Sequence, residues 1–162
     1  MVARFQQIDQ QGGVATGRIY LARPGRMRVE YDPPARYLLV ASGGALVYYD
    51  GEIDQVTTLP LSSTPAWFLL RSHISLTDGV TVTDFQRTPG ALRVAVIDTQ
   101  DPGSGSVMLV FENQPLALKQ WTVTDAQGNV TQVVLENPTF GVDIDPNLFA
   151  LPTARGPRHR SN

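Results

Sequence analysis

The stretch that decides the fold is GRIYLARPGRMRVEYDPP, residues 17–34. It predicts a β-hairpin with its turn at Pro24-Gly25. In the second arm Met27, Val29 and Tyr31 alternate with three charged residues. This alternation is typical of a half-buried strand with one apolar and one charged face.

The first arm of this hairpin places a cation on an apolar face. Ile19 and Leu21 share a face with Arg23, which stands at the end of the strand. A cation in that position must reach solvent, pair with an anion or donate to carbonyl oxygens, because an unpaired buried charge is costly. The residues alone leave these options open.

Across the whole chain, turn residues are spaced as in an antiparallel β protein. Its 162 residues include 14 glycines and 12 prolines, and turn signals recur roughly every ten residues. We expect the first segment, Arg4–Asp9, to be a strand or the tail of a helix. Further strands are expected at Tyr37–Ala41, Ala45–Asp50, Gln55–Leu59, Val80–Thr88, Ala91–Asp98, Val107–Glu112, Leu116–Asp125 and Val130–Glu136.

The predicted fold is mainly β: a strongly curved antiparallel sheet, an unclosed half-barrel of about 10–11 strands, with a short apolar lid helix. Two packed sheets remain an alternative on pattern alone. We expect residues 1–152 to form one domain, and the basic residues 153–162 to be disordered because they lack apolar anchors.

One segment, residues 62–71, breaks the strand pattern. Ser63 or Thr64 is expected to cap a two-turn helix with Pro65 at its first position. The following sequence, AWFLL at 66–70, is apolar on all sides, so it must pack on another apolar surface. It is either a helix of the core or a lid over a cavity.

Polar residues do not suggest catalysis. The chain has no cysteine, two histidines and a net charge of −2, which excludes thiolate chemistry and gives no electrostatic footprint for nucleic acid. No G-x-S-x-G sequence supplies a nucleophilic serine for His73, and Ser104 lies in a GSGS sequence typical of a flexible turn. No ligand spacing predicts a metal or another cofactor. A small esterase using His73 is the enzymatic alternative.

Four blocks together resemble the outer-membrane lipoprotein carrier family, LolA: residues 17–34, YLLVASGGALVYYD at 37–50, STPAWFLL at 63–70 and NPTFGVDIDPNLFALP at 137–152. The resemblance implies a half-barrel whose lid covers a hydrophobic cavity. It also implies a non-enzymatic periplasmic carrier that takes acylated lipoproteins from an inner-membrane transporter to an outer-membrane acceptor lipoprotein. We expect its signal peptide to have been removed.

The resemblance also implies roles for individual residues. Arg23 would latch the lid, which would contain Pro65, Trp67, Phe68, Leu69 and Leu70. The expected cavity residues are Ile19, Leu21, Met27, Val29, Tyr31, Leu39, Leu46, Tyr48, Val94, Leu109 and Trp121. The family has a long helix before its first strand, whereas only residues 1–8 precede the first turn here, so we expect either a truncated helix or a member that lacks it.

Two relatives of the same fold remain alternatives to the carrier. One is a module that senses lipid or lipoprotein in an envelope-stress regulator, which usually has a second domain. The other is the outer-membrane acceptor, which would be anchored through a lipidated cysteine.

Overall fold

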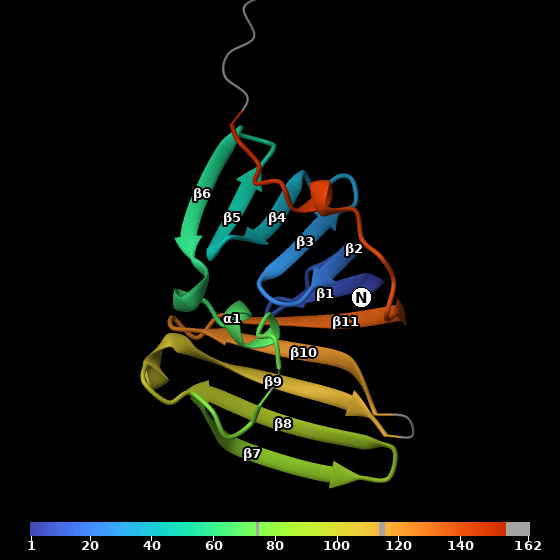
Figure 1. The fold of residues 1–162 in the computed structure, drawn as a ribbon, viewed down its shortest axis with the longest axis vertical. Helices are drawn as coiled ribbons and strands as arrows, with labels where there is room; N and C mark the ends of the chain where they lie inside the picture. The colour runs from blue at the N-terminus through green and yellow to red at the C-terminus, as the bar shows by residue number, and fades with distance from the viewer. Residues whose placement is uncertain (74, 114–115, 155–162) are drawn as a thin grey trace, which may run out of the picture.

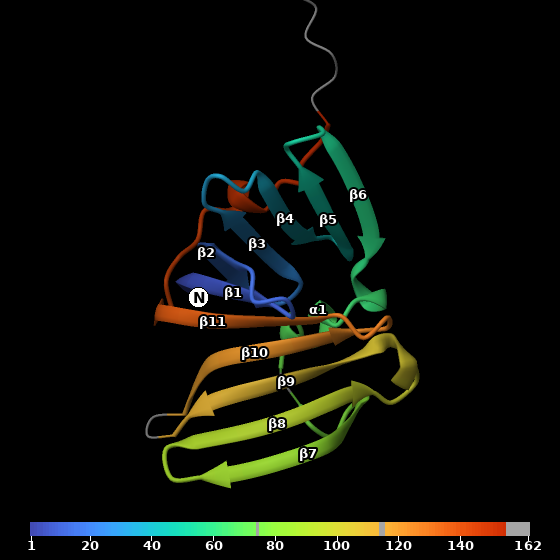
Figure 2. The ribbon, with the colours of Figure 1, turned by 180° about the vertical axis from the view of Figure 1, so that it is seen from behind.

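The structure is a computed structural model that describes residues 1–73, 75–113 and 116–154. Its strands form one antiparallel sheet of 11 strands in the order β6-β5-β4-β3-β2-β1-β11-β10-β9-β8-β7. The sheet is strongly bent, and its two edges, β6 and β7, stay apart (Figures 1 and 2). The predicted unclosed, curved sheet is therefore confirmed, and the two-sheet alternative is wrong.

The strands follow one another through short turns over most of the chain. Their bounds are β1 Val2–Asp9, β2 Val14–Ala22, β3 Arg26–Tyr31, β4 Tyr37–Ser42, β5 Ala45–Asp50, β6 Gln55–Pro60, β7 Val80–Thr88, β8 Ala91–Asp98, β9 Gly105–Glu112, β10 Ala117–Asp125 and β11 Val130–Thr139. The helical elements are η1 Leu61–Ser63, α1 Ala66–Leu69, η2 Pro102–Ser104 and η3 Pro146–Phe149.

The first strand joins the two halves of the sheet. The sequence left a choice between strand and helix at residues 4–9, and β1 is a strand that pairs with β2 on one side and with β11 on the other. The residues before the first turn are therefore part of the sheet and not the end of a helix. Phe5 lies opposite both Gly17 and Leu135 and is 2% exposed.

The predicted β2–β3 hairpin is present, but its turn is one residue longer and its register is shifted accordingly. Ala22 pairs with Arg26, so the turn is Arg23–Gly25 and not the two residues predicted. Arg23 leaves the ladder because its side chain and the amide of Gly25 both donate to the segment that carries α1.

Helix α1 is a single turn, shorter than the two turns predicted. Its N-cap is Pro65, and no side chain caps it. The predicted caps bond to the preceding 3₁₀ turn instead: Ser63 Oγ donates to the carbonyl of Pro60 and Thr64 Oγ1 to that of Leu61. In Figure 1 α1 lies in front of the middle of the sheet.

Both faces of the sheet carry apolar side chains, and each is covered separately. The main core lies on the concave face under α1 and includes Phe5, Ile19 and Leu109. On the opposite face, the segment after β11 passes back over β3 and β4 (Figure 1). Its Phe149 is 4% exposed and the guanidinium of Arg26 lies 5.3 Å from its ring.

This second cover explains the hairpin of β4 and β5, whose arms are apolar on both faces. Val40 and Val47 are fully or almost fully buried without joining the main core. The basic tail predicted at residues 153–162 lies, from residue 155 onward, outside the described residues.

Gly17 is required for the close approach of β1, β2 and β3. A methyl group there would overlap the carbonyl oxygen of Glu30 and lie 2.8 Å from Cε1 of Phe5. We expect Gly17→Ala to destabilise the fold by about 1–3 kcal/mol, as overpacking does, and to lower Tm by about 3–10 °C. Gly103→Ala is the control, because a methyl group there meets nothing within 4 Å. Equal Tm values for the two variants would show that the strands can separate at no cost.

An exposed ion pair holds β1, β2 and the end of β3 together. Arg4 donates through both terminal nitrogens to Asp32, and Thr16 Oγ1 donates to the same carboxylate at 2.7 Å. These bonds, that of Arg4 first, lower the pKa of Asp32 from 3.8 to about 2. A lowered pKa stabilises the folded state above the unfolded pKa, and the effect is lost as the pH falls through the folded value.

We therefore expect wild type to be more stable than Asp32→Asn above about pH 4, and the difference to disappear between about pH 4 and 2. Denaturant unfolding at a series of pH values measures it. The difference should also shrink in high salt, since the pair is exposed. Parallel stability curves for the two proteins below pH 4 would contradict this assignment.

Candidate functional site

The concave face contains a largely apolar pocket of about 250 Å³ beneath α1, which we name the inner pocket. Its walls come from both halves of the sheet and from residues 64–71 around α1, which we name the lid segment. They are Phe5, Gln7, Ile19, Met27, Val29, Tyr31, Leu39, Leu46, Thr64, Pro65, Ala66, Leu69, Trp121, Val123, Thr131 and Val133.

Most of the predicted cavity residues line this inner pocket: Ile19, Met27, Val29, Tyr31, Leu39, Leu46 and Trp121. The other four lie elsewhere. Leu21 and Tyr48 each line a neighbouring pocket. Val94 and Leu109 are 1% and 0% exposed and pack in the core.

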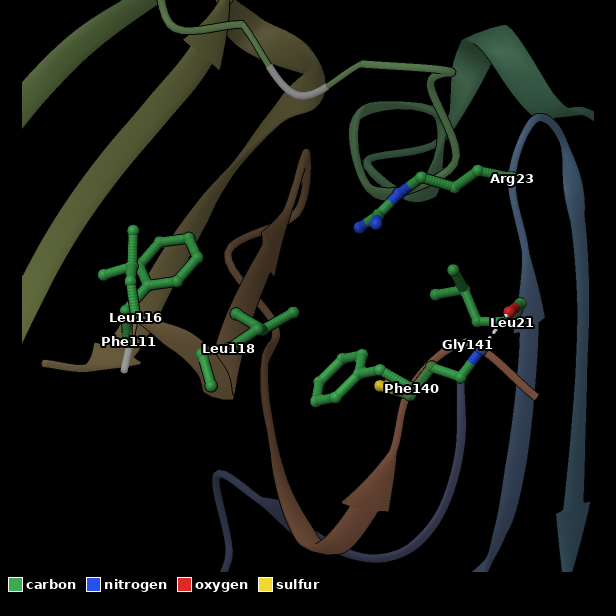
Figure 3. Close-up of a pocket in the computed structure, with 9 residues that line it drawn as sticks. Leu21, Arg23, Phe111, Leu116, Leu118, Phe140 and Gly141 are labelled. Carbon is green, nitrogen blue, oxygen red and sulfur yellow. Dashed lines mark hydrogen bonds between the residues drawn. The ribbon is translucent and has the colours of Figure 1, made fainter. Parts of the chain in front are cut away.

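A second pocket, of about 550 Å³, lies beyond the other side of the lid segment; we name it the Arg23 pocket. Figure 3 shows Leu116 and Leu118 across the space from Leu21 and Phe140, with the guanidinium of Arg23 pointing into it. Met1, Phe111, Ala117 and Gly141 complete the lining. Apart from Arg23, the lining side chains are apolar.

The C-terminal end of α1 lies between the two pockets, held by the β2–β3 turn. Arg23 Nε donates to the carbonyl of Leu69 at 2.8 Å, and the Gly25 amide donates to the carbonyl of Leu70 at 2.7 Å. The last carbonyls of a helix have no partner within it. The turn therefore satisfies two acceptors that would otherwise be left unpaired.

Burial lowers the pKa of Arg23 from its usual value. An arginine nevertheless remains charged at neutral pH, so its bond to Leu69 is charge-assisted and stronger than a neutral one. A half-buried cation that lines an apolar pocket is thus stabilised by the lid that it holds.

Three side chains of the lid segment are buried in the core, and a fourth is half-buried at its edge. Phe68, Leu69 and Leu70 are 2%, 3% and 2% exposed. Trp67 is half-buried, and the guanidinium of Arg71 lies 5.2 Å from its ring. Arg71 also donates to the carbonyl of Asp78 at 2.7 Å, which ties the end of the lid to the approach to β7.

A third pocket, of about 350 Å³, adjoins the inner pocket where β1 and β3 end; we name it the tyrosine pocket. Its lining is Gln7, Asp9, Gly13, Val14, Ala15, Tyr31, Ala35, Tyr37 and Tyr48. Sequence reasoning missed Gln7, Asp9 and Tyr37. The odd-numbered positions of β1, which place Gln7 and Asp9 on the face of Phe5, were the available signal.

The other residues considered from the sequence do not form a reactive group. His73 is exposed, and Ser104 lies in η2 and donates to the carbonyl of Asp101. Among the described residues there is no group of three histidine or acidic side chains that could hold a metal ion. A search of the same residues found no helix with the length and apolar character needed to cross a membrane.

Comparison with known proteins agrees with this geometry. The family model of the outer membrane lipoprotein carrier protein LolA matches residues 1–152. The outer-membrane lipoprotein carrier protein of Methylococcus capsulatus is 33% identical over 138 residues, which are 82% of this chain and 65% of that protein. That of Chromohalobacter salexigens is 30% identical over 159 residues, or 93% and 75% of the two chains.

The crystal structure of a DUF1329 family protein from Desulfovibrio piger has a TM-score of 0.50 at 12% identity. It covers 91% of this chain and 87% of that one, which shows a shared fold only. The chain spans about two thirds of the length of the Methylococcus relative.

A half-barrel with apolar pockets around a short lid defines a class of binding proteins for apolar ligands. Within this class, the chain belongs to the family of the outer membrane lipoprotein carrier protein LolA. The family resemblance drawn from the sequence blocks is therefore confirmed.

We expect Arg23→Met, which keeps the length of the side chain but removes its donors, to loosen α1. Loss of a charge-assisted hydrogen bond of about 1.5–3 kcal/mol should speed hydrogen exchange of the Leu70 amide by about 10–100-fold. Arg93→Met, at an exposed position of β8, is the matched control. Unchanged protection in Arg23→Met would mean that burial alone holds the lid.

Proposed function

We propose that this chain is a periplasmic carrier that shields the acyl chains of lipoproteins on its concave face and delivers them toward the outer membrane. The observation that carries the proposal is the pair of largely apolar pockets of about 250 and 550 Å³, the first lined by lid residues and the second by Arg23, which bonds to the lid. Membership of the lipoprotein carrier family supports the same role.

The size and looseness of the pockets suit cargo that must leave again. Three acyl chains carry about 45 methylenes, and at ~0.8 kcal/mol each their full burial would approach ~36 kcal/mol. Non-covalent binding saturates near 18–21 kcal/mol. A carrier therefore cannot use a tight fit to every methylene, and open apolar pockets are the appropriate design.

In this proposal the lid occupies part of the space that the cargo needs. Pro65, Ala66 and Leu69 line the inner pocket, so incoming alkyl chains would displace them. Arg23 would then act as the latch that closes the free protein. The two partners of the proposed cycle are an inner-membrane transporter that releases lipoproteins and an outer-membrane acceptor lipoprotein.

Binding of acyl chains can be tested at Leu46, a half-buried wall residue of the inner pocket. A carboxylate there would have to be desolvated by an alkyl chain. We expect Leu46→Glu to weaken binding of a triacylated peptide by at least tenfold, measured by displacement of the neutral fluorophore N-phenyl-1-naphthylamine.

Val130→Glu places the same charge at an exposed strand position outside the pocket linings and should bind as wild type. The proposal fails if the acylated peptide does not displace the probe from the wild-type protein. It also fails if Leu46→Glu, shown to be folded by circular dichroism, binds the peptide as tightly as the control.

A further inference from the structure

The tyrosine pocket adjoins the inner pocket but has different chemistry. Gln7 and Tyr31 line both, and the hydroxyl of Tyr31 donates to Gln7 Oε1 at 2.7 Å. This pair forms the boundary. On one side the walls are mostly aliphatic, whereas on the other they are aromatic and polar.

The aromatic wall is preorganised. Tyr31 meets the edge of Phe5 at 5.4 Å between ring centroids and that of Tyr37 at 6.1 Å. Tyr37 in turn stacks on Tyr48 at 5.6 Å. Rings held in this way need little ordering when a ligand binds, so contacts to them are not offset by a large entropy cost.

Three donors of the wall remain available to a ligand. Within the part of the chain that the structure describes, no hydrogen bond is found for the hydroxyls of Tyr37 and Tyr48 or for the side-chain amide nitrogen of Gln7. Burial and then the neighbouring Tyr37 and Asp50 raise the pKa of Tyr48 to about 12. Its hydroxyl is therefore protonated and can donate at neutral pH.

The lining of this pocket carries a negative charge. Asp9 is the charged residue among those that line it, and its Oδ1 accepts from the amides of Gln11 and Gly13, which fixes its position. Asp50 and Glu52 also act on Tyr48 and raise its pKa. An anionic group placed here would meet carboxylates of the same sign.

We propose that the tyrosine pocket binds the polar head of an acylated polypeptide, the amide carbonyls of its lipid-bearing residue, and rejects lipids with an anionic head group. The inference rests on the proposed carrier function. The carbonyl oxygens accept hydrogen bonds from the hydroxyls of Tyr37 and Tyr48 and from the side-chain amide of Gln7. The alkyl chains enter the inner pocket. Asp9 provides the discrimination against anions.

The physical need for such a site follows from the ligand. Phospholipids carry alkyl chains like those of a lipoprotein, and an apolar pocket distinguishes such chains poorly because a methylene contributes little. Discrimination has to come from the head group. A carboxylate that repels phosphate and donors that match uncharged carbonyls provide both a repulsive and an attractive element.

The test measures two ligands with the same two palmitoyl chains: a dipalmitoylglyceryl-cysteine peptide without charged side chains and dipalmitoylphosphatidylglycerol. Each displaces N-phenyl-1-naphthylamine from the full chain below its critical micelle concentration. Wild type should prefer the peptide. The double variant Tyr37→Phe/Tyr48→Phe keeps both rings and should lose about tenfold in affinity for the peptide, with affinity for the phospholipid unchanged.

A second variant separates charge from hydrogen bonding. Asp9→Asn keeps an oxygen acceptor for the turn amides but removes the charge, and it should raise affinity for the phospholipid several-fold without changing that for the peptide. Tyr20→Phe, which removes a hydroxyl outside the pocket linings, should match wild type with both ligands.

The outcomes separate the two proposals. If neither ligand displaces the probe from wild type, the carrier function itself is wrong. If both ligands bind but the double variant loses equally for both, or for neither, the tyrosine pocket does not read the head group and this inference is overturned. A peptide-specific loss together with a phospholipid-specific gain supports it.

Discussion

The structure depends on how a one-turn apolar helix is held on an open sheet. Four residues cannot form a stable helix alone, since nucleation alone is unfavourable. The turn between β2 and β3 solves this by donating to the carbonyls of Leu69 and Leu70, once from the side chain of Arg23 and once from the amide of Gly25. The β2–β3 hairpin therefore also positions the element that covers the concave face.

That face cannot be covered by the sheet itself. An 11-stranded sheet whose edges do not meet leaves a long apolar concave surface, and α1 spans only its middle. The convex face is closed differently, by Phe149 over β3 and β4. This convex cover is local to β3 and β4, and the partial cover of the concave face leaves the inner pocket beside the lid segment.

Period-2 alternation was enough to predict strands such as β3, because residues such as Met27 and Val29 follow a purely local pattern, and the number of strands predicted a curved sheet. The alternation did not identify the lining of each pocket. Leu21 and Ile19 share a strand face but line different pockets, since the lid end lies between them. Val94 has the same alternation yet packs in the core, a difference set by tertiary contacts. The predicted cap at Thr64 was wrong: Pro65 is the N-cap of α1, and the hydroxyl of Thr64 donates to the carbonyl of Leu61 in the preceding 3₁₀ turn.

The energy of lid docking is compatible with the exchange of cargo in the proposed carrier. Burying Phe68, Leu69 and Leu70 stabilises the closed form by about 5–9 kcal/mol, at about 1.5–3 for each side chain. At ~0.8 kcal/mol per methylene, an incoming chain matches this after burying roughly six to eleven methylenes. One long acyl chain is thus near balance with the lid, and a cargo with several chains exceeds it. In the proposed carrier, lid side chains and alkyl chains would therefore compete for the same surface of the inner pocket.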